Sequence, residues 1–135
     1  MPDQPPANEE LKIVCIEDCG NAPRKKILLD FIVAYAKGDL DAILEQVADT
    51  ISWNRVGDKE IQGKDRLIEV LTQMKDFYAT ELRIENIITH GYTAAMNGII
   101  IFEEKHYSFC NVYKFNGTSK SAKIKEISTY AIDIS

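Results

Sequence analysis

The sequence predicts an α+β domain in which a curved antiparallel sheet wraps around three N-terminal helices. Two helical patterns separated by Gly38 and Asp39 come early in the chain, and a third begins at Gly63. Four long segments rich in β-branched and aromatic residues follow, joined by turn-compatible sequences. Strands of this length must curve strongly to wrap three helices, so we expect a cone-shaped α+β barrel with an internal cavity.

The composition is that of an ordinary globular domain. A chain of 135 residues forms one domain that buries about two thirds of the surface its unfolded chain would expose. No apolar run approaches the ~20 residues of a membrane-spanning helix, so no membrane association is expected. The net charge of −5 comes without a basic stripe, which argues against nucleic acid as a partner. The start of the chain lacks the apolar segment of a secretory signal, so the expected location is cytoplasmic.

Residues 1–22 are expected to form an N-terminal arm, and residues 23–135 the domain. Within the arm, the run from Leu11 to Ile16 is β-prone. It is compatible with an edge strand, a helical turn packed on the barrel or an arm that reaches a partner subunit. Cys15 and Cys19 lack the spacing of a Cys-x-x-Cys motif, so buried or incidental thiols are favoured over a metal or redox site. Neither a metal nor another cofactor is expected.

Amphipathic patterns predict three helices, from Pro23 to Lys37, from Leu40 to Val47 and from Gly63 to Asp76. Each pattern repeats its apolar residues on a 3.6-residue period. Asn21 is the expected N-cap of the first helix and Asp39 that of the second. Gly38 ends the first helix because glycine accepts a positive φ.

After Asp49 the apolar period changes from 3.6 to 2, which indicates a strand. In this strand Ile51, Trp53 and Arg55 point to one face. The later strands are expected over Leu82 to His90, Ala94 to Glu104, Tyr107 to Asn116 and Ala122 to Asp133.

The chain resembles the nuclear transport factor 2-like superfamily in the succession FIVAYAKGDLDAILEQVADTISW, IQGKDRLIEVL, FCNVYKFNG and IKEISTYAID. This superfamily of cone-shaped α+β barrels includes SnoaL-like polyketide cyclases and ketosteroid isomerases. The resemblance covers Lys25 to Asp133 and implies the fold. It implies no single reaction, because the same cavity carries many chemistries.

Ketosteroid isomerases show where this chain departs from a catalytic relative. The resemblance places their helix-one tyrosine at Phe31, their base at Arg55 and their far-wall acid at Asn111. Phe31 cannot donate a hydrogen bond, and Arg55 cannot accept a proton at neutral pH. The ketosteroid isomerase mechanism is therefore not expected, and no catalytic residue is assigned.

The inward faces of the resembling barrels predict an aromatic pocket with one cation and one amide. The candidate ligand-binding residues are Phe31, Tyr35, Trp53, Arg55, Phe109, Asn111 and Tyr113. Burying an arginine without a partner costs free energy. We therefore expect Arg55 either to pair with an acid such as Glu126 or Glu85 or to bind an anionic group of a ligand. We expect a SnoaL-like pocket protein for a small apolar or aromatic anionic ligand, and isomerase, cyclase and hydrolase activities all stay open.

The alternative is a non-catalytic dimerisation or protein-interaction module of the same fold. Ser108, Cys110 and Val112 are expected on the convex face of the sheet, with Ile100 and Phe102 beside them. An apolar face without a covering helix needs another subunit. A homodimer through this face is therefore expected.

Overall fold

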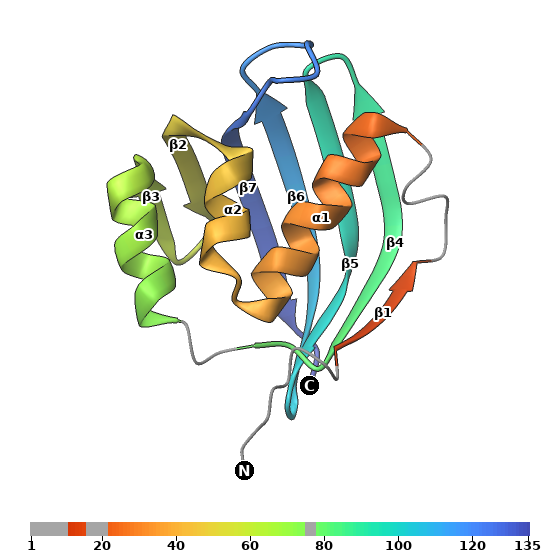
Figure 1. Ribbon diagram of the computed structural model, residues 1–135. Helices are drawn as coiled ribbons and strands as arrows, with labels where there is room; N and C mark the ends of the chain where they lie inside the picture. The colour runs from red at the N-terminus through yellow and green to blue at the C-terminus, as the bar shows by residue number, and fades with distance from the viewer. Residues whose placement is uncertain (1–10, 16–21, 75–77) are drawn as a thin grey trace.

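The computed structural model describes residues 11–15, 22–74 and 78–135. Three helices cover one face of a seven-stranded sheet (Figure 1), which confirms the expected α+β fold. The helices are α1 (Pro23–Lys37), α2 (Leu40–Gln46) and α3 (Lys64–Gln73). The strands are β1 (Lys12–Cys15), β2 (Val47–Arg55), β3 (Lys59–Gln62), β4 (Glu81–His90), β5 (Thr93–Phe102), β6 (Lys105–Phe115) and β7 (Ile124–Asp133).

The strands follow the order β1-β4-β5-β6-β7-β2-β3, so β1 and β3 are the edges and the sheet is not closed. Most neighbours are antiparallel, but β1 runs parallel to β4 and β2 runs parallel to β7. The sheet is therefore mixed rather than wholly antiparallel. The parallel β2–β7 pair brings the Trp53 end of β2 beside Thr129, more than seventy positions later in the chain.

The helix boundaries follow from local chemistry. Pro23 lies in the first turn of α1, where its missing N–H is not needed. The N-cap is Ala22, without a side-chain bond, and the expected cap Asn21 lies outside the described residues. Gly38 ends α1 in the left-handed conformation with φ 73°, and Asp39 caps α2 by accepting the backbone N–H of Ala42 at 3.2 Å.

Several predicted boundaries differ by a few residues from those of the structure, and two of them have a clear local cause. Val47 begins β2 instead of ending α2, because this β-branched residue takes an extended conformation and pairs with Ile124 on β7. The strand predicted to run to Glu104 stops at Phe102, since Glu103 takes a positive φ of 53° in the turn. The end predicted for the third helix, Asp76, lies outside the described residues.

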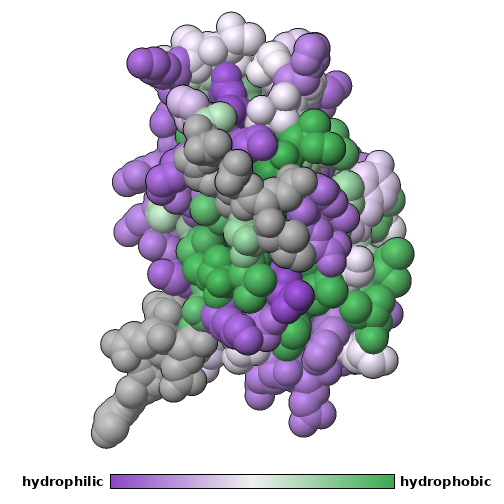
Figure 2. All heavy atoms as spheres, turned by 90° about the vertical axis from the view of Figure 1, so that its right-hand side faces the viewer, coloured by the Kyte–Doolittle hydropathy of each residue, from purple (hydrophilic) through white to green (hydrophobic). Residues whose placement is uncertain are grey.

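The run within the N-terminal arm is an edge strand. Residues Lys12–Cys15 form β1, which pairs with β4 and decides between the three alternatives left open by the sequence. Figure 2 views the molecule from the side of β1 and β4, where hydrophobic and hydrophilic side chains are interspersed.

Cys15 is disulfide-bonded, so the expectation of an incidental thiol is wrong for this residue. Residue spacing excluded a Cys-x-x-Cys motif but carried no information on the distance between two sulfur atoms. Cys19 lies outside the described residues, and Cys110 is a free cysteine.

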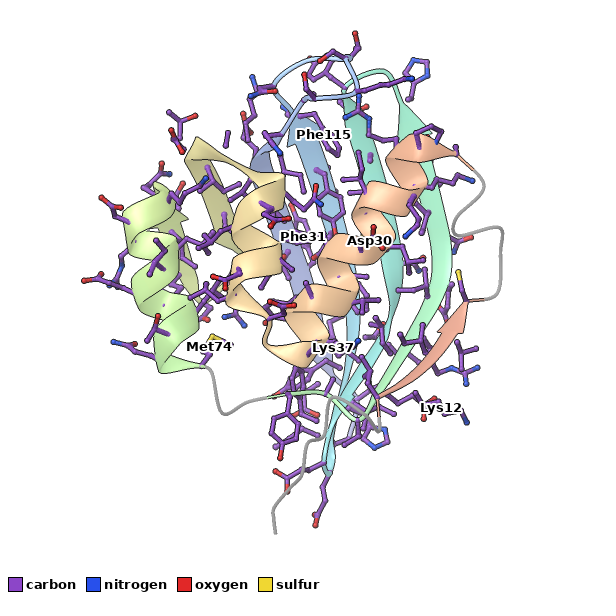
Figure 3. All side chains as sticks on the ribbon, in the orientation of Figure 1. Lys12, Asp30, Phe31, Lys37, Met74 and Phe115 are labelled. Carbon is purple, nitrogen blue, oxygen red and sulfur yellow. The ribbon has the colours of Figure 1, made fainter. Side chains whose placement is uncertain are left out.

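The core fills the space between the helices and the concave face of the sheet. Its largest fully buried side chains are Leu28, Phe31, Ile43, Ile51, Ile61, Leu67, Leu82, Ile84, Met96, Tyr113, Phe115 and Ile124. Figure 3 shows Phe31 between α1 and the sheet and Phe115 at the far end of β6. Among the described residues no helix is long and apolar enough to cross a membrane.

The convex face differs from expectation at two residues. Ile100 is buried and pairs with Tyr107 on β6. Tyr107 lies on the face of β6 that is turned to the helices. Phe102 lies two residues after Ile100 and therefore on the same face of β5. Both therefore belong to the concave side. Alternation along β5 groups Ile100 with Phe102, but only the pairing with β6 shows which side the group takes.

Candidate functional site

A pocket of about 360 Å³ opens at the end of the cone where β5 turns into β6. Its walls come from α1, β2, the end of α3 and strands β5, β6 and β7. The lining residues are Ile32, Tyr35, Trp53, Arg55, Met74, Ile100, Phe102, Glu103, Lys105, Tyr107, Phe109, Asn111, Thr129 and Ala131.

Five of the seven candidate residues border this pocket, namely Tyr35, Trp53, Arg55, Phe109 and Asn111. Phe31 and Tyr113 do not, because both are completely buried beneath it. Their rings meet edge to face at 6.1 Å, and the Phe31 ring lies 5.7 Å from the Trp53 ring. They support the wall from behind, while contact of any of the seven with a ligand stays a prediction.

A chain of hydrogen bonds holds one wall in place. The indole Nε1 of Trp53 donates to Oγ1 of Thr129 at 2.8 Å, and this hydroxyl donates to Oδ1 of Asn111 at 2.7 Å. Nδ2 of Asn111 in turn donates to the hydroxyl of Tyr113 at 2.9 Å. Asn111 is 3% exposed and is the one buried polar side chain of the described residues, so both ends of its amide need these partners.

This network engages both ends of the Asn111 amide. Its carbonyl oxygen and its NH₂ group are each engaged within the protein, which orients the Trp53 ring through Thr129. Sequence reasoning missed Thr129, since its pairing with Asn111 depends on the β6–β7 register.

Arg55 has two weak contacts among the described residues, an ion pair with Asp58 and a contact with Met74. Its side chain is 29% exposed, and its Nε lies 4.0 Å from a carboxylate oxygen of Asp58, beyond hydrogen-bonding distance. One terminal nitrogen contacts the Met74 sulfur at 3.8 Å, a weak acceptor. Among the described residues neither Glu126 nor Glu85 pairs with it. Most of the guanidinium's donors therefore remain available.

Two tyrosines that line the same pocket, Tyr35 and Tyr107, have hydroxyls without a hydrogen-bond partner in the described part of the chain. Burial raises the pKa of Tyr35, the positive charge of Arg55 opposes that rise, and Tyr107 adds to it. Tyr35 is therefore a neutral donor at physiological pH. Alternation with Phe109 and Asn111 along β6 would have identified Tyr107 from the sequence.

The mouth of the pocket carries charges of both signs. Glu103 and Lys105 lie there, and Lys105 reaches Asp133 on β7 at 3.4 Å. Within the described ranges, Glu103 is the one carboxylate that borders the pocket. No group of three or more metal-ligating side chains occurs in the part of the chain that the structure describes.

The pocket therefore combines two kinds of surface. Aromatic and aliphatic side chains, above all Trp53 and Phe109, form an apolar wall. Arg55, Tyr35 and Tyr107 place hydrogen-bond donors beside this wall, since Arg55 shares a face of β2 with Trp53 and the Tyr35 ring lies 5.7 Å from the Trp53 ring. Such a site can hold a molecule with an apolar body and a negatively charged oxygen, because the donors offset the loss of water around that oxygen.

Comparison with solved structures shows the same fold in several proteins of low sequence identity. An NTF-2 like protein of unknown function from Burkholderia xenovorans LB400 superposes with a TM-score of 0.68 at 18% identity, over 82% of this chain and 84% of that chain. The epoxide hydrolase/cyclase-like enzyme SalBIII, described with a role in pyran ring formation in the polyether salinomycin, gives 0.65 at 16% identity, over 81% and 90%. An LEH-like epoxide hydrolase of M. tuberculosis gives 0.62 at 19% identity, over 79% and 80%.

Sequence comparison identifies the family to which the chain belongs. Comparison with curated proteins found no match. The profile of the SnoaL-like domain matches residues 28–126, which include α2, α3 and the strands β2 to β6. Together with the shared fold, this match confirms the resemblance to the nuclear transport factor 2-like superfamily: the chain belongs to the SnoaL-like domain family.

Proposed function

We propose that this protein binds a small apolar or aromatic molecule that carries a carboxylate or enolate oxygen. One observation carries the proposal. The guanidinium of Arg55, held only by weak contacts, borders a pocket whose other walls are mostly aromatic and aliphatic. A cation with free donors in such a place matches an anionic oxygen on an apolar body.

The proposed binding mode follows from the arrangement of the walls. The apolar body packs against Trp53 and Phe109, whose rings supply contact area at little entropic cost. The anionic oxygen accepts hydrogen bonds from Arg55 and from the neutral phenol of Tyr35. Lys105 at the mouth is paired with Asp133, and Glu103 also lies there, so the attraction for the anion rests on Arg55.

The same donors define the chemistry that this pocket would favour. An enolate or another oxyanion formed during isomerisation, cyclisation or hydrolysis would be stabilised where Arg55 and Tyr35 point. Each of these reactions also needs a proton acceptor. Glu103 is the carboxylate of the described residues that borders the pocket, so catalysis is proposed to depend on it.

Titration of Trp53 fluorescence tests the proposal, because Trp53 is the only tryptophan and borders the pocket. Phenylacetate and 2-naphthoate serve as probes, with their neutral amides as controls. Arg55→Ala is expected to weaken carboxylate binding about 10- to 100-fold, the range of a hydrogen bond to a charged group. Arg66→Ala, which breaks an exposed 2.7 Å ion pair with Glu69 outside the pocket, is the matched control. Equal carboxylate affinity in wild type and Arg55→Ala would show that Arg55 does not bind the carboxylate.

A second proposal concerns assembly. We propose that two copies pair through the convex face, where exposed Ile88, Tyr130 and Ile132 surround a shallow groove of about 380 Å³. No charged side chain of the described residues lines this groove, and an uncharged surface can face its own copy across a two-fold axis without repulsion. The alternative function, a dimerisation module without chemistry, rests on this surface. The cytoplasmic location is likewise a proposal that rests on the sequence alone.

A further inference from the structure

A second chamber adjoins the main pocket. It has a volume of about 230 Å³ and lies between the α1–α2 turn, the end of α3 and the end of β5. Its lining residues are Tyr35, Gly38, Leu40, Ile43, Leu71, Thr72, Met74 and Phe102. Tyr35, Met74 and Phe102 also line the main pocket, so the two spaces meet at these three side chains.

The chemistry of the second chamber is apolar. Among the described residues no charged side chain lines it, and the polar side-chain groups that they contribute are the hydroxyls of Tyr35 and Thr72. Its volume exceeds the about 150 Å³ of an engineered apolar cavity that binds benzene. A short alkyl chain or a small ring therefore fits the chamber in both size and polarity.

The boundary between the two spaces is close to the cation. A terminal nitrogen of Arg55 lies 3.8 Å from the sulfur of Met74, and Figure 3 shows Met74 at the end of α3. Methionine is unbranched and readily changes rotamer, so it separates the spaces less rigidly than a ring would. A carboxylate bound to Arg55 would thus have its substituents within reach of both spaces.

We infer that the second chamber binds an apolar tail of the same ligand, which makes the ligand an amphipathic carboxylate. Its charged group lies at Arg55, and an alkyl or small-ring tail passes Met74 to lie against Leu40, Ile43 and Leu71. This inference rests on the proposed function, since the anchoring of the head at Arg55 is part of that proposal.

A chain-length series tests the inference. Affinities of the straight-chain carboxylates from butanoate to decanoate are measured by calorimetry for the wild type and for Thr72→Phe. Thr72 is exposed at the rim, so a phenyl ring there can fill the chamber without removing a core side chain. Wild-type affinity is expected to rise about fourfold for each added methylene until the chamber is full. In Thr72→Phe the ratio of the butanoate and decanoate dissociation constants is expected to fall at least about tenfold.

Two further variants make the result decisive. Thr50→Phe places the same ring at an exposed position of β2 outside both chambers and is expected to keep the wild-type ratio. Leu40→Phe narrows the chamber from α2 and replaces Thr72→Phe if that variant does not fold. A wild-type affinity independent of chain length, or an unchanged ratio in the folded chamber variants, overturns the inference and leaves the proposed function standing. If no carboxylate of any length binds in a manner that depends on Arg55, the proposed function itself fails.

Discussion

At the scale of single residues, the buried Tyr113 contributes both to the stability of the fold and to the hydrogen-bond chain of the pocket wall. Its hydroxyl accepts the hydrogen bond from Asn111 that ends the chain from Trp53. Burial raises the pKa of Tyr113 far above the ordinary value of 10.0, although the bond from Asn111 acts in the opposite direction. The folded state therefore holds the phenol proton at pH values where an unfolded chain has lost it.

Tyr113→Phe is expected to destabilise the protein by about 1–3 kcal/mol at pH 7, because the amide of Asn111 loses its acceptor. Urea unfolding followed by circular dichroism measures the change. Tyr130→Phe, which alters an exposed tyrosine, is the control and is expected to stay within about 0.5 kcal/mol of wild type at this pH.

The same variant gives a prediction about pH. Below pH 10 both folded and unfolded states keep the Tyr113 proton, so this group adds no pH dependence. Above pH 10 only the unfolded state loses it, and the free energy of unfolding falls by up to about 1.4 kcal/mol per pH unit. Tyr113→Phe lacks this loss, so the stability gap between the two proteins is expected to narrow above pH 10. A gap that stays constant from neutral to strongly alkaline pH would contradict the raised pKa.

Tyr35 differs from Tyr113, because its hydroxyl has no hydrogen-bond partner in the described part of the chain. Tyr35→Phe is therefore expected to change the free energy of unfolding by less than about 1 kcal/mol. It is expected to weaken binding of carboxylate probes about tenfold while sparing their neutral amides. Loss of affinity for both probe types would indicate a change of pocket shape instead.

At the scale of elements, the β4–β5 pair depends on one glycine. Gly98 lies where the pairing shifts between Ile84 and Asn86, and a Cβ atom on it would overlap the carbonyl oxygen of Arg83. The backbones of β4 and β5 thus approach more closely than any side chain allows. An irregularity of this kind locally bends a strand pair, and β5 carries Ile100 and Phe102 of the pocket lining.

Gly98→Ala is expected to cost about 2–4 kcal/mol, because the obstacle is backbone and cannot swing aside. Gly117→Ala is the matched control: nothing lies within 4 Å of the added atom, and the change is expected to stay within about 0.5 kcal/mol. Denaturant unfolding of both variants checks the pair. Similar free energies of unfolding for the two variants would show that β4 and β5 can move apart around the added Cβ atom without loss of stability.

At the scale of the whole molecule, the helices cover one face of the sheet and leave the convex face without a covering helix among the described elements (Figure 1). Ile132 is 66% exposed there, Ile88 62% and Tyr130 50%. Apolar side chains grouped on such a face favour a partner. The pocket is lined by the opposite, concave face, so the proposed assembly and the proposed ligand binding would use separate surfaces.

Ile132→Glu is expected to weaken self-association at least about tenfold, because a dimer would bury the new carboxylate without a partner. Light scattering at micromolar concentration measures the mass. Val56→Glu, which alters an exposed valine in the turn after β2, is the control and is expected to leave the mass unchanged. A monomeric wild type would contradict the proposed dimer.

The helices, most of the strands and several residues of one pocket wall could be predicted from local patterns in the chain. Periodicity sets which side chains share a face, so Trp53 and Arg55 could be grouped on one strand, and Tyr35 could be assigned to the inner stripe of α1. These local patterns need only the geometry of a single helix or strand. The resemblance then supplied the arrangement of the elements.

Side-chain contacts between different helices and strands could be identified only from the folded structure. The β6–β7 register placed Thr129 beside Asn111, the β5–β6 register turned Phe102 inward, and the end of α3 brought Met74 to Arg55. Each of these contacts joins segments far apart in the chain. Their pairing depends on the relative shift of whole strands and helices, and a one-residue shift reverses every side chain without altering the local pattern.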